Sequence, residues 1–280
     1  MTDQPQTRPT QVPAFREISS DTNPTFKDLK KAKDNEHQDL CIASGLRFFD
    51  MIPPTSLQVI AVKKSWLDAQ SPNSKARKIL QTYFDQPVQR LVLSDPLFDS
   101  INPSNVPDCV FALRKPLSTR IALNELFQWK GSTLLLTGRN PLNLGAQIRT
   151  AAAFGLDRVV RLSGSVDPFH SLVIRSSAGA SLRYSPYHTD GISALGEFAN
   201  TLSAAESKRL ILFDLEGQPL PNFRFPKNPI FLFGEEGQGL ADFAQSHRCS
   251  QVNIPMSKSV ESLNLGASTA IALYAWHTRQ

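Results

Sequence analysis

The stretch NPLNLGAQIRTAAAFG, residues 140–155, decides how the second half of the chain is interpreted. It lies between two apolar runs, residues 132–138 and 157–162, which are typical of buried strands. Apolar residues recur within it at helical spacing, which predicts a helix with one buried face. Gly155 is expected to end this helix as a C-cap. The stretch therefore predicts a strand–helix–strand unit.

Outward from this unit, the same alternation continues to the end of the sequence. We expect further strands at residues 209–215, 228–234 and 250–256, an extended segment at 181–188, and helices at 168–180, 192–207, 238–247 and 262–279. Strands that alternate with helices over short connections predict an α/β fold, in which helices cover both faces of a parallel sheet.

The first part of the chain predicts a separate, smaller α/β unit. Its expected strands are residues 56–66, 88–98 and 108–115, and its expected helices are residues 37–52 and 74–86. The domain boundaries that we infer are a disordered tail at 1–20, an N-terminal domain at 21–118, a linker with one short helix at 119–130, and a C-terminal domain at 131–280.

Composition narrows the class of protein. The chain is 41% hydrophobic and 20% charged, which is ordinary for a globular protein, and it has no apolar run long enough to span a membrane. Its first residues lack the apolar core of a signal peptide. The three cysteines are far apart and have no metal-ligand spacing, which indicates reduced thiols in a cytoplasmic protein without a bound metal. A net charge of +5 is compatible with a polyanionic partner.

Three loops are candidates for a functional site, because ligands of a parallel sheet bind beyond the carboxyl ends of its strands. These loops are residues 137–145, 234–240 and 255–264. The first leads into the helix with Asn143 and Arg149. Gly145, between them, allows something bulky to approach the backbone closely. Arg149 falls at the edge of the buried helical face, where it is either a site residue or a surface arginine whose alkyl chain covers apolar neighbours.

Glycines dominate the second loop, GEEGQGL, which directly follows an apolar strand. Such a backbone either exposes N–H groups to a ligand or forms a plain turn. The loop lacks the Lys-Ser/Thr pair of a phosphate-binding loop. The adjacent Glu235 and Glu236 face opposite sides of an extended chain, which disfavours a hydrolase with paired carboxylates. In the third loop, Ser262 and Asn264 precede an apolar helix, where they either cap it or line a site.

Together and in this order, the three loops resemble the SpoU (TrmH) type of the SPOUT superfamily. Its members are S-adenosylmethionine-dependent RNA ribose 2′-O-methyltransferases. The matching residues are Asn143, Gly145, Ala146, Arg149 and Thr150 in the first motif, Gly234, Glu236, Gly237 and Gly239 in the second, and Ile254, Pro255, Met256, Ser262, Leu263 and Asn264 in the third. The segment RSSAGA, residues 175–180, resembles a further family segment. In the first part of the chain, residues 18–31 and 42–50 resemble the family's accessory RNA-binding domain.

The resemblance implies an enzyme that methylates ribose 2′-hydroxyls of structured RNA, ribosomal RNA more than transfer RNA. It implies a homodimer whose two copies both contribute to the site, and a C-terminal segment threaded into a deep trefoil knot. It implies S-adenosyl-L-methionine as cofactor, in contact with Gly234, Ile254 and Leu263. The residues to which it assigns catalytic roles are Arg149, Asn143, Glu236, Ser262 and Asn264.

Two departures from the family pattern are Gln147, in place of an apolar residue, and Leu265–Gly266, in place of Val-Ser. Neither removes a residue assigned to chemistry. Gly266 is expected to loosen the start of the last helix by about 0.5–1 kcal/mol at most. The alternatives that stay open are a transfer RNA ribose methyltransferase, an enzyme that methylates a base atom, and a non-catalytic RNA-binding protein that retains the fold.

Overall fold

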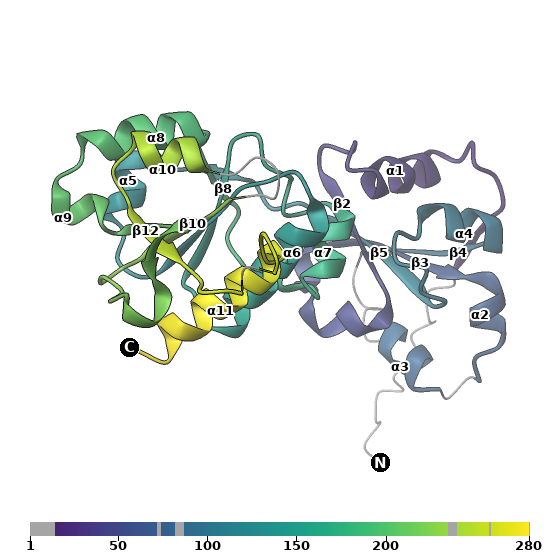
Figure 1. The fold of residues 1–280 in the computed structure, drawn as a ribbon. Helices are drawn as coiled ribbons and strands as arrows, with labels where there is room; N and C mark the ends of the chain where they lie inside the picture. Colours follow the sequence, from purple (N-terminus) through teal and green to yellow (C-terminus); the bar gives the residue numbers. More distant parts are fainter. Residues whose placement is uncertain (1–14, 72–73, 82–86, 235–239, 258, 280) are drawn as a thin grey trace, which may run out of the picture. The chain divides into compact units, whose positions relative to one another are not determined.

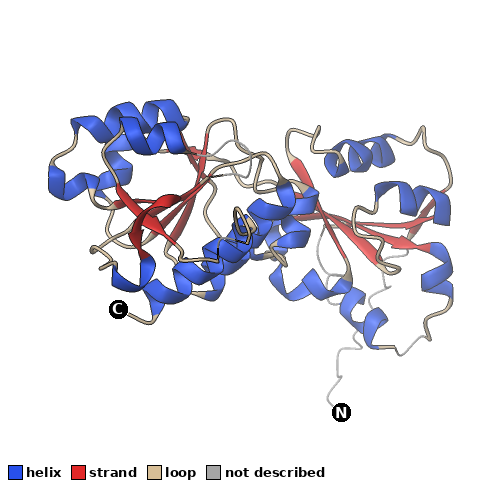
Figure 2. Ribbon diagram, in the orientation of Figure 1, coloured by secondary structure: helices blue, strands red, loops and turns tan. Residues whose placement is uncertain are grey.

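A computed structural model describes residues 15–279, apart from residues 72–73, 82–86, 235–239 and 258. The chain divides into two compact units, Met1–Arg114 and Lys115–Gln280. Figure 1 labels their helices and strands, and Figure 2 separates the two kinds of element by colour.

A mixed five-stranded sheet forms the first unit, in the order β1-β4-β3-β5-β2. β1, β4 and β3 run parallel, whereas β5 is antiparallel to both of its neighbours. The strands are β1 (Arg16–Ile18), β2 (Leu40–Ser44), β3 (Leu57–Lys63), β4 (Gln89–Leu93) and β5 (Cys109–Arg114). The helices are α1 (Pro24–Lys33), α2 (Lys64–Asp68), α3 (Lys75–Gln81) and α4 (Asp95–Ile101), with 3-10 turns η1 (Leu46–Met51) and η2 (Pro54–Ser56).

Two expectations for this unit are wrong. The helix expected at residues 37–52 is instead β2 followed by η1. Gly45 has a φ of 102°, which a continuous α-helix cannot accommodate. Pairing with β5 buries four consecutive residues of β2, which a single helical face cannot do. The disordered tail does not extend to residue 20, because β1 pairs with β4 and buries Ile18. Residues 1–14 of that tail lie outside the described part of the chain.

The second unit contains a seven-stranded sheet in the order β12-β10-β11-β7-β8-β9-β6, and all of its described strand pairs are parallel. The strands are β6 (Thr119–Arg120), β7 (Thr133–Leu136), β8 (Arg158–Leu162), β9 (Tyr187–Thr189), β10 (Leu210–Pro219), β11 (Ile230–Phe233) and β12 (Ser250–Asn253). The helices are α5 (Leu123–Gln128), α6 (Pro141–Ala153), α7 (Ser171–Ser176), α8 (Ile192–Thr201), α9 (Ala204–Ser207), α10 (Ala241–Ser246) and α11 (Leu265–His277), with 3-10 turns η3 (Ala180–Leu182) and η4 (Leu220–Asn222).

Each face of this sheet is covered by its own set of helices, as Figure 2 shows. Side chains of α6, α7 and α11 pack on one face, against alternate residues of the central strands such as Leu134 and Phe231. Side chains of α5, α8 and α10 pack on the other face, against the intervening residues such as Leu135 and Leu232. The predicted parallel sheet between two helical layers is therefore confirmed. The trefoil knot stays a prediction.

The segment expected as a linker, residues 119–130, belongs to the second unit. Its first residues form β6, which pairs with β9, and the short helix expected within it is α5. The chain divides earlier, between Arg114 and Lys115. Within the described residues, no helix is both long enough and apolar enough to cross a membrane.

Candidate functional site

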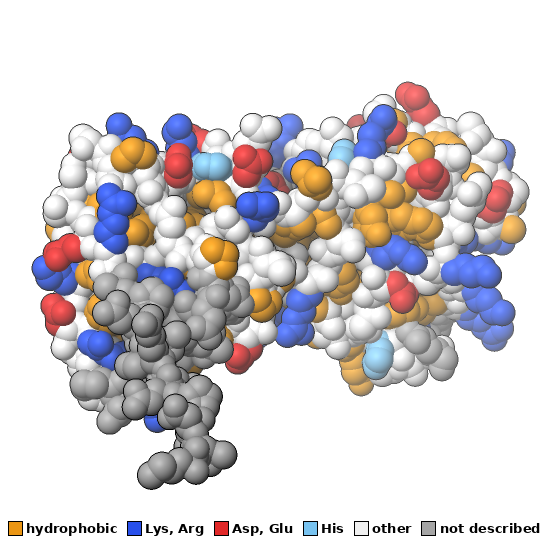
Figure 3. Space-filling model, turned by 180° about the vertical axis from the view of Figure 1, so that it is seen from behind, with side chains coloured by type: hydrophobic (Ala, Val, Ile, Leu, Met, Phe, Trp, Pro, Cys, Tyr) orange, Lys and Arg blue, Asp and Glu red, His pale blue; other side chains and the backbone are white. Residues whose placement is uncertain are grey.

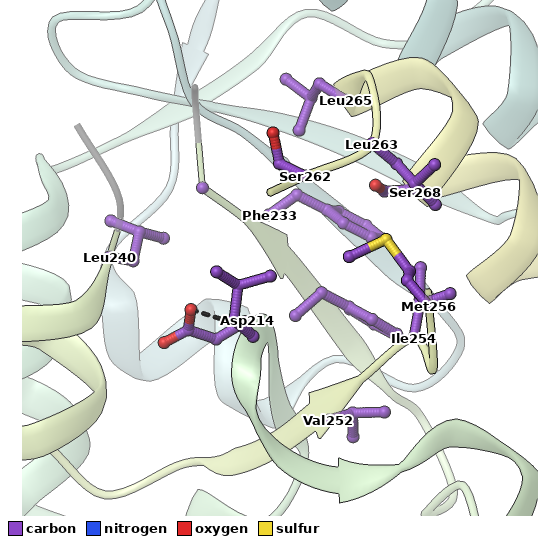
Figure 4. Close-up of a pocket in the computed structure, with 13 residues that line it drawn as sticks. Asp214, Phe233, Leu240, Val252, Ile254, Met256, Ser262, Leu263, Leu265 and Ser268 are labelled. Carbon is purple, nitrogen blue, oxygen red and sulfur yellow. Dashed lines mark hydrogen bonds between the residues drawn. The ribbon is translucent and has the colours of Figure 1, made fainter. Parts of the chain in front are cut away.

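A cavity of about 230 Å³ lies at the carboxyl ends of β11 and β12, beside residues 213–215 of β10 (Figure 4). This is close to the lower end for small-molecule pockets, about 300 Å³. Its position is the one expected for a ligand of a parallel sheet. The described residues that line it are Phe213, Asp214, Leu215, Phe233, Gly234, Leu240, Val252, Ile254, Met256, Ser262, Leu263, Leu265 and Ser268.

Strand ends and two loops build the walls of the cavity. Phe213 of β10 and Phe233 of β11 stack, with ring centroids 4.6 Å apart and planes 11° from parallel. The hydroxyl of Thr137, which follows β7, donates a 2.7 Å hydrogen bond to the Phe233 carbonyl. This bond fixes the end of β11 at the point where the chain leaves the sheet as Gly234. The cavity therefore has a rigid aromatic base.

The three residues predicted to contact a cofactor, Gly234, Ile254 and Leu263, all line this one cavity. They come from two different loops and are separated by up to 29 positions in the sequence. Ser262 lines the cavity as well, and the N-cap of α11 is Asn264, so Ser262 is not the helix cap that was its alternative interpretation. In Figure 4, Leu263 and Met256 lie on one side of the cavity and Asp214 and Leu240 on the other.

A hydrogen bond joins the first candidate loop to the third. The Asn264 side-chain amide donates to the Asn143 side-chain oxygen at 3.0 Å. The Asn264 oxygen in turn accepts the backbone N–H of Gly266 at 2.9 Å, which makes Asn264 the N-cap of α11. Both asparagines are thus held in a fixed orientation beside Leu263.

Arg149 is placed differently from the other candidates. It is exposed on α6 and does not line the cavity, and no hydrogen bond or ion pair joins its side chain to another described residue. Its guanidinium is therefore available to an external group. Glu236, Gly237 and Gly239 lie outside the described residues.

The close approach expected at Gly145 is to α7. A Cβ at this position would lie 1.8 Å from the Ser176 hydroxyl oxygen and 2.9 Å from the Ser177 backbone nitrogen. Gly266 has a similar role, because its Cβ would lie 2.8 Å from that of Ala146 on α6. The departure at Gly266, expected to loosen α11, thus permits close packing of α11 on α6.

Asp214 was missed by the sequence analysis. Asp214 lines the cavity, and one of its carboxylate oxygens accepts the backbone N–H of Leu215 at 2.7 Å. The available signal was an acidic residue directly after the apolar part of the strand at 209–215, at a carboxyl strand end.

The described residues contain neither a candidate metal-ion site nor, at Cys249 beside Asp214, a reactive thiol. They contain no group of three or more His, Cys, Asp or Glu side chains placed to hold a metal ion. Burial, reinforced by the charge of Asp214, raises the pKa of the Cys249 thiol to about 11. This thiol is therefore protonated at neutral pH and is a poor nucleophile.

Comparison with known proteins identifies the family. Residues 133–274 match the model of the SpoU rRNA Methylase family, so the chain belongs to that family. The matched residues run from β7 into α11. They include the residues that line the cavity and the Asn143–Asn264 pair.

Two curated relatives and one solved structure illustrate the likeness. Ribosomal RNA small subunit methyltransferase G 2 of Syntrophobacter fumaroxidans is 30% identical over 94% of this chain and 49% of its own length. 23S rRNA (guanosine-2′-O-)-methyltransferase RlmB of Xanthomonas campestris is 31% identical over 54% of this chain and 60% of its own length. The chain thus spans about half the length of the curated relatives it matches. An AdoMet-bound rRNA methyltransferase from Sinorhizobium meliloti has the same fold, with a TM-score of 0.70 and 20% identity over 93% of this chain and 97% of the other.

Proposed function

We propose that this protein is an S-adenosylmethionine-dependent methyltransferase acting on ribose 2′-hydroxyls of structured RNA, and that the RNA is ribosomal. The observation that carries the proposal is the convergence of Gly234, Ile254, Ser262 and Leu263 on one cavity. Membership of the SpoU rRNA methylase family supports it, as does the name of the Xanthomonas relative, a 23S rRNA guanosine-2′-O-methyltransferase.

The chemistry of the cavity fits this cofactor. Aromatic and aliphatic side chains form most of the lining, which suits an adenine ring, while Asp214, Ser262 and Ser268 supply polar groups. Gly234, Ile254 and Leu263 would hold the cofactor, in part through their backbone groups. When bound, S-adenosylmethionine supplies a methyl group made electrophilic by its sulfonium, without a metal ion.

Arg149 would orient the acceptor hydroxyl and a neighbouring phosphate. A guanidinium stays protonated in proteins, so a role as general base is disfavoured. Its five donors in a planar fork suit phosphate and hydroxyl oxygens, and a positive charge there stabilises the oxygen as its proton leaves. Asn143, fixed by Asn264, would position the same substrate, and Ser262 would complete the pocket beside it. Glu236 would hold the second loop or the subunit contact.

We also propose a homodimer. Apolar side chains are exposed on the two helices next to the Asn143–Asn264 pair: Leu142 on α6 is 52% exposed, and Ile271 and Tyr274 on α11 are 40% and 60% exposed. Leu142 and Arg149 are seven positions apart on α6 and share one face. A second copy that covers this face would bring its own residues to Arg149. Sedimentation measurements should give twice the mass of one chain, and a monomer at micromolar concentration would contradict the dimer.

The first unit would recognise RNA outside the reacting nucleotide. On the face drawn in Figure 3, Lys and Arg are interspersed with Asp and Glu, so net charge alone marks no single surface there. On α1, however, Lys27, Lys30 and Lys31 are all exposed. Changing all three to Gln should weaken RNA binding most at low salt. Equal affinity of both proteins across a salt series would contradict this role.

The three cysteines are free thiols, which supports a cytoplasmic location that cell fractionation can test.

Product analysis tests the proposed reaction. The protein is incubated with ribosomal RNA and methyl-labelled S-adenosylmethionine, and the RNA is digested to nucleosides. We expect the label on the ribose of one nucleoside. A matched control is Leu263→Trp, which fills the cavity and should abolish both cofactor binding and transfer. Label on a base would favour base methylation. If the protein binds RNA but neither binds S-adenosylmethionine nor transfers a methyl group, a non-catalytic protein would be favoured.

A further inference from the structure

Four residues of β10, 214–217, form a bulged loop in its pairing with β12, at the edge of the cavity. Phe213 and Gln218 both pair with Val252 of β12, so residues 214–217 lie outside the ladder. Gly217 allows this loop to lie close against β12, because a Cβ there would lie 2.7 Å from the carbonyl carbon of Gln251. The loop places Asp214 and Leu215 in the lining of the cavity.

The orientation of Asp214 within this loop is fixed. Its Oδ1 accepts the backbone N–H of Leu215 at 2.7 Å, drawn as a dashed line in Figure 4. An ionised carboxylate has about four acceptor positions, so most of its capacity remains for a ligand. The side chain is half-buried rather than extended into solvent.

Asp214 is the only ionisable side chain among the described residues that line the cavity. None of those residues is Lys or Arg, so no described cation in the lining offsets its charge. Beside it, Phe213 and Phe233 present stacked rings. A carboxylate acts more strongly in such an apolar setting than in water, and aromatic faces also attract cations. The cavity is thus suited to a ligand with a positive centre.

We propose that Asp214 is a cofactor-binding residue that recognises the positive charge of the sulfonium. This inference rests on the proposed function and adds to it a preference for the methyl donor over the product. On transfer, the ribose 2′-oxygen would form a bond to the methyl carbon, the sulfur would keep the electron pair of the broken S–C bond as a neutral thioether, and the hydroxyl proton would go to solvent. Asp214 would then face a ligand without the sulfonium charge, so the product would be held less tightly.

Calorimetric titration of the full chain tests this with two ligands that differ in the sulfonium charge, S-adenosylmethionine and S-adenosylhomocysteine. Asp214→Asn removes the charge but keeps the oxygen that accepts the Leu215 N–H. We expect it to weaken S-adenosylmethionine binding about tenfold and S-adenosylhomocysteine binding less than about twofold, as for loss of one partly screened ionic contact. The matched control is Glu216→Gln, an exposed carboxylate of the same loop that does not line the cavity. It should change neither affinity.

The outcomes separate this inference from the proposed function. If Asp214→Asn weakens both ligands equally, or neither, while the unaltered protein binds S-adenosylmethionine, the charge-recognition role is wrong and the proposed function stands. If the unaltered protein binds neither ligand, both are overturned. Unchanged thermal unfolding of Asp214→Asn shows that its loop remains folded, and a larger donor-specific loss at low salt supports an ionic interaction.

Discussion

The packing of α6 on α7 predicts a large effect from the smallest possible substitution, Gly145→Ala. In a helix interior this change by itself would stabilise the protein by about 1 kcal/mol, because Ala is the better helix former. Here the added Cβ would lie 1.8 Å from the Ser176 hydroxyl oxygen, 2.8 Å from the Ser176 Cβ and 2.9 Å from the Ser177 backbone nitrogen. The hydroxyl can rotate away, but the other two atoms cannot.

Overpacking of this kind typically costs about 1–3 kcal/mol, and contacts this short place Gly145→Ala at the upper end. After subtraction of the helix-propensity gain, we expect a net loss of about 2 kcal/mol. For a unit of this size that corresponds to a decrease in Tm of about 4–8 °C. This loss is measured by thermal and urea unfolding of the full chain, monitored by a probe of the second unit such as Trp276 fluorescence.

A double-mutant cycle identifies the cause. Ser176→Ala removes the nearest atom, so in its background Gly145→Ala should cost about 1 kcal/mol less. A Gly145→Ala protein as stable as the unaltered one, or more stable, would refute the packing explanation. The close approach that the sequence predicts at Gly145 would then serve something other than the packing of α7.

Two further predictions concern polar groups in the same unit. Gln147 is fully buried between α6 and α11, where its Nε2 donates to the Thr269 hydroxyl at 3.2 Å while its Oε1 has no partner among the described residues. Gln147→Met should therefore stabilise the protein by about 1 kcal/mol in urea unfolding, and a loss of that size would contradict it. The Tyr184 hydroxyl donates to the Leu156 carbonyl at 3.2 Å, and burial, with the charge of Asp157, raises its pKa to about 12. Since this folded-state pKa lies above the unfolded value of about 10, its contribution is complete below pH 10 and is lost as the pH rises through about 12. Tyr184→Phe should cost about 1 kcal/mol at neutral pH and show a shallower alkaline decline, and identical pH profiles would rule this out.

Much of the second unit could be predicted because its signals are local. The apolar runs that became β7, β8, β10 and β11, and the spacing that became α6, depend on neighbouring residues alone. The candidate loops followed from the rule that ligands bind at carboxyl strand ends. The family resemblance then singled out Gly234, Ile254 and Leu263, which line the cavity.

Features that depend on distant pairing could not be predicted. Apolar residues at 40–52 fit either a helix or a strand, and only pairing with β5 selects the strand. The loop that carries Asp214 exists because β10 pairs twice with Val252, almost 40 positions away. For the same reason, the sequence showed that Gly145 permits a close approach but not that Ser176 is the neighbour.

Single-turnover methyl transfer by Arg149→Ala, measured together with its affinity for S-adenosylmethionine, tests the central claim most directly. Arg149→Lys serves as a control that keeps the charge but loses the planar fork. We predict that Arg149→Ala lowers the transfer rate by about two orders of magnitude, the scale of losing one preorganised donor, with cofactor affinity unchanged. An unchanged transfer rate would show that this exposed arginine takes no part in the reaction, and the proposed site would then lack its substrate-orienting group.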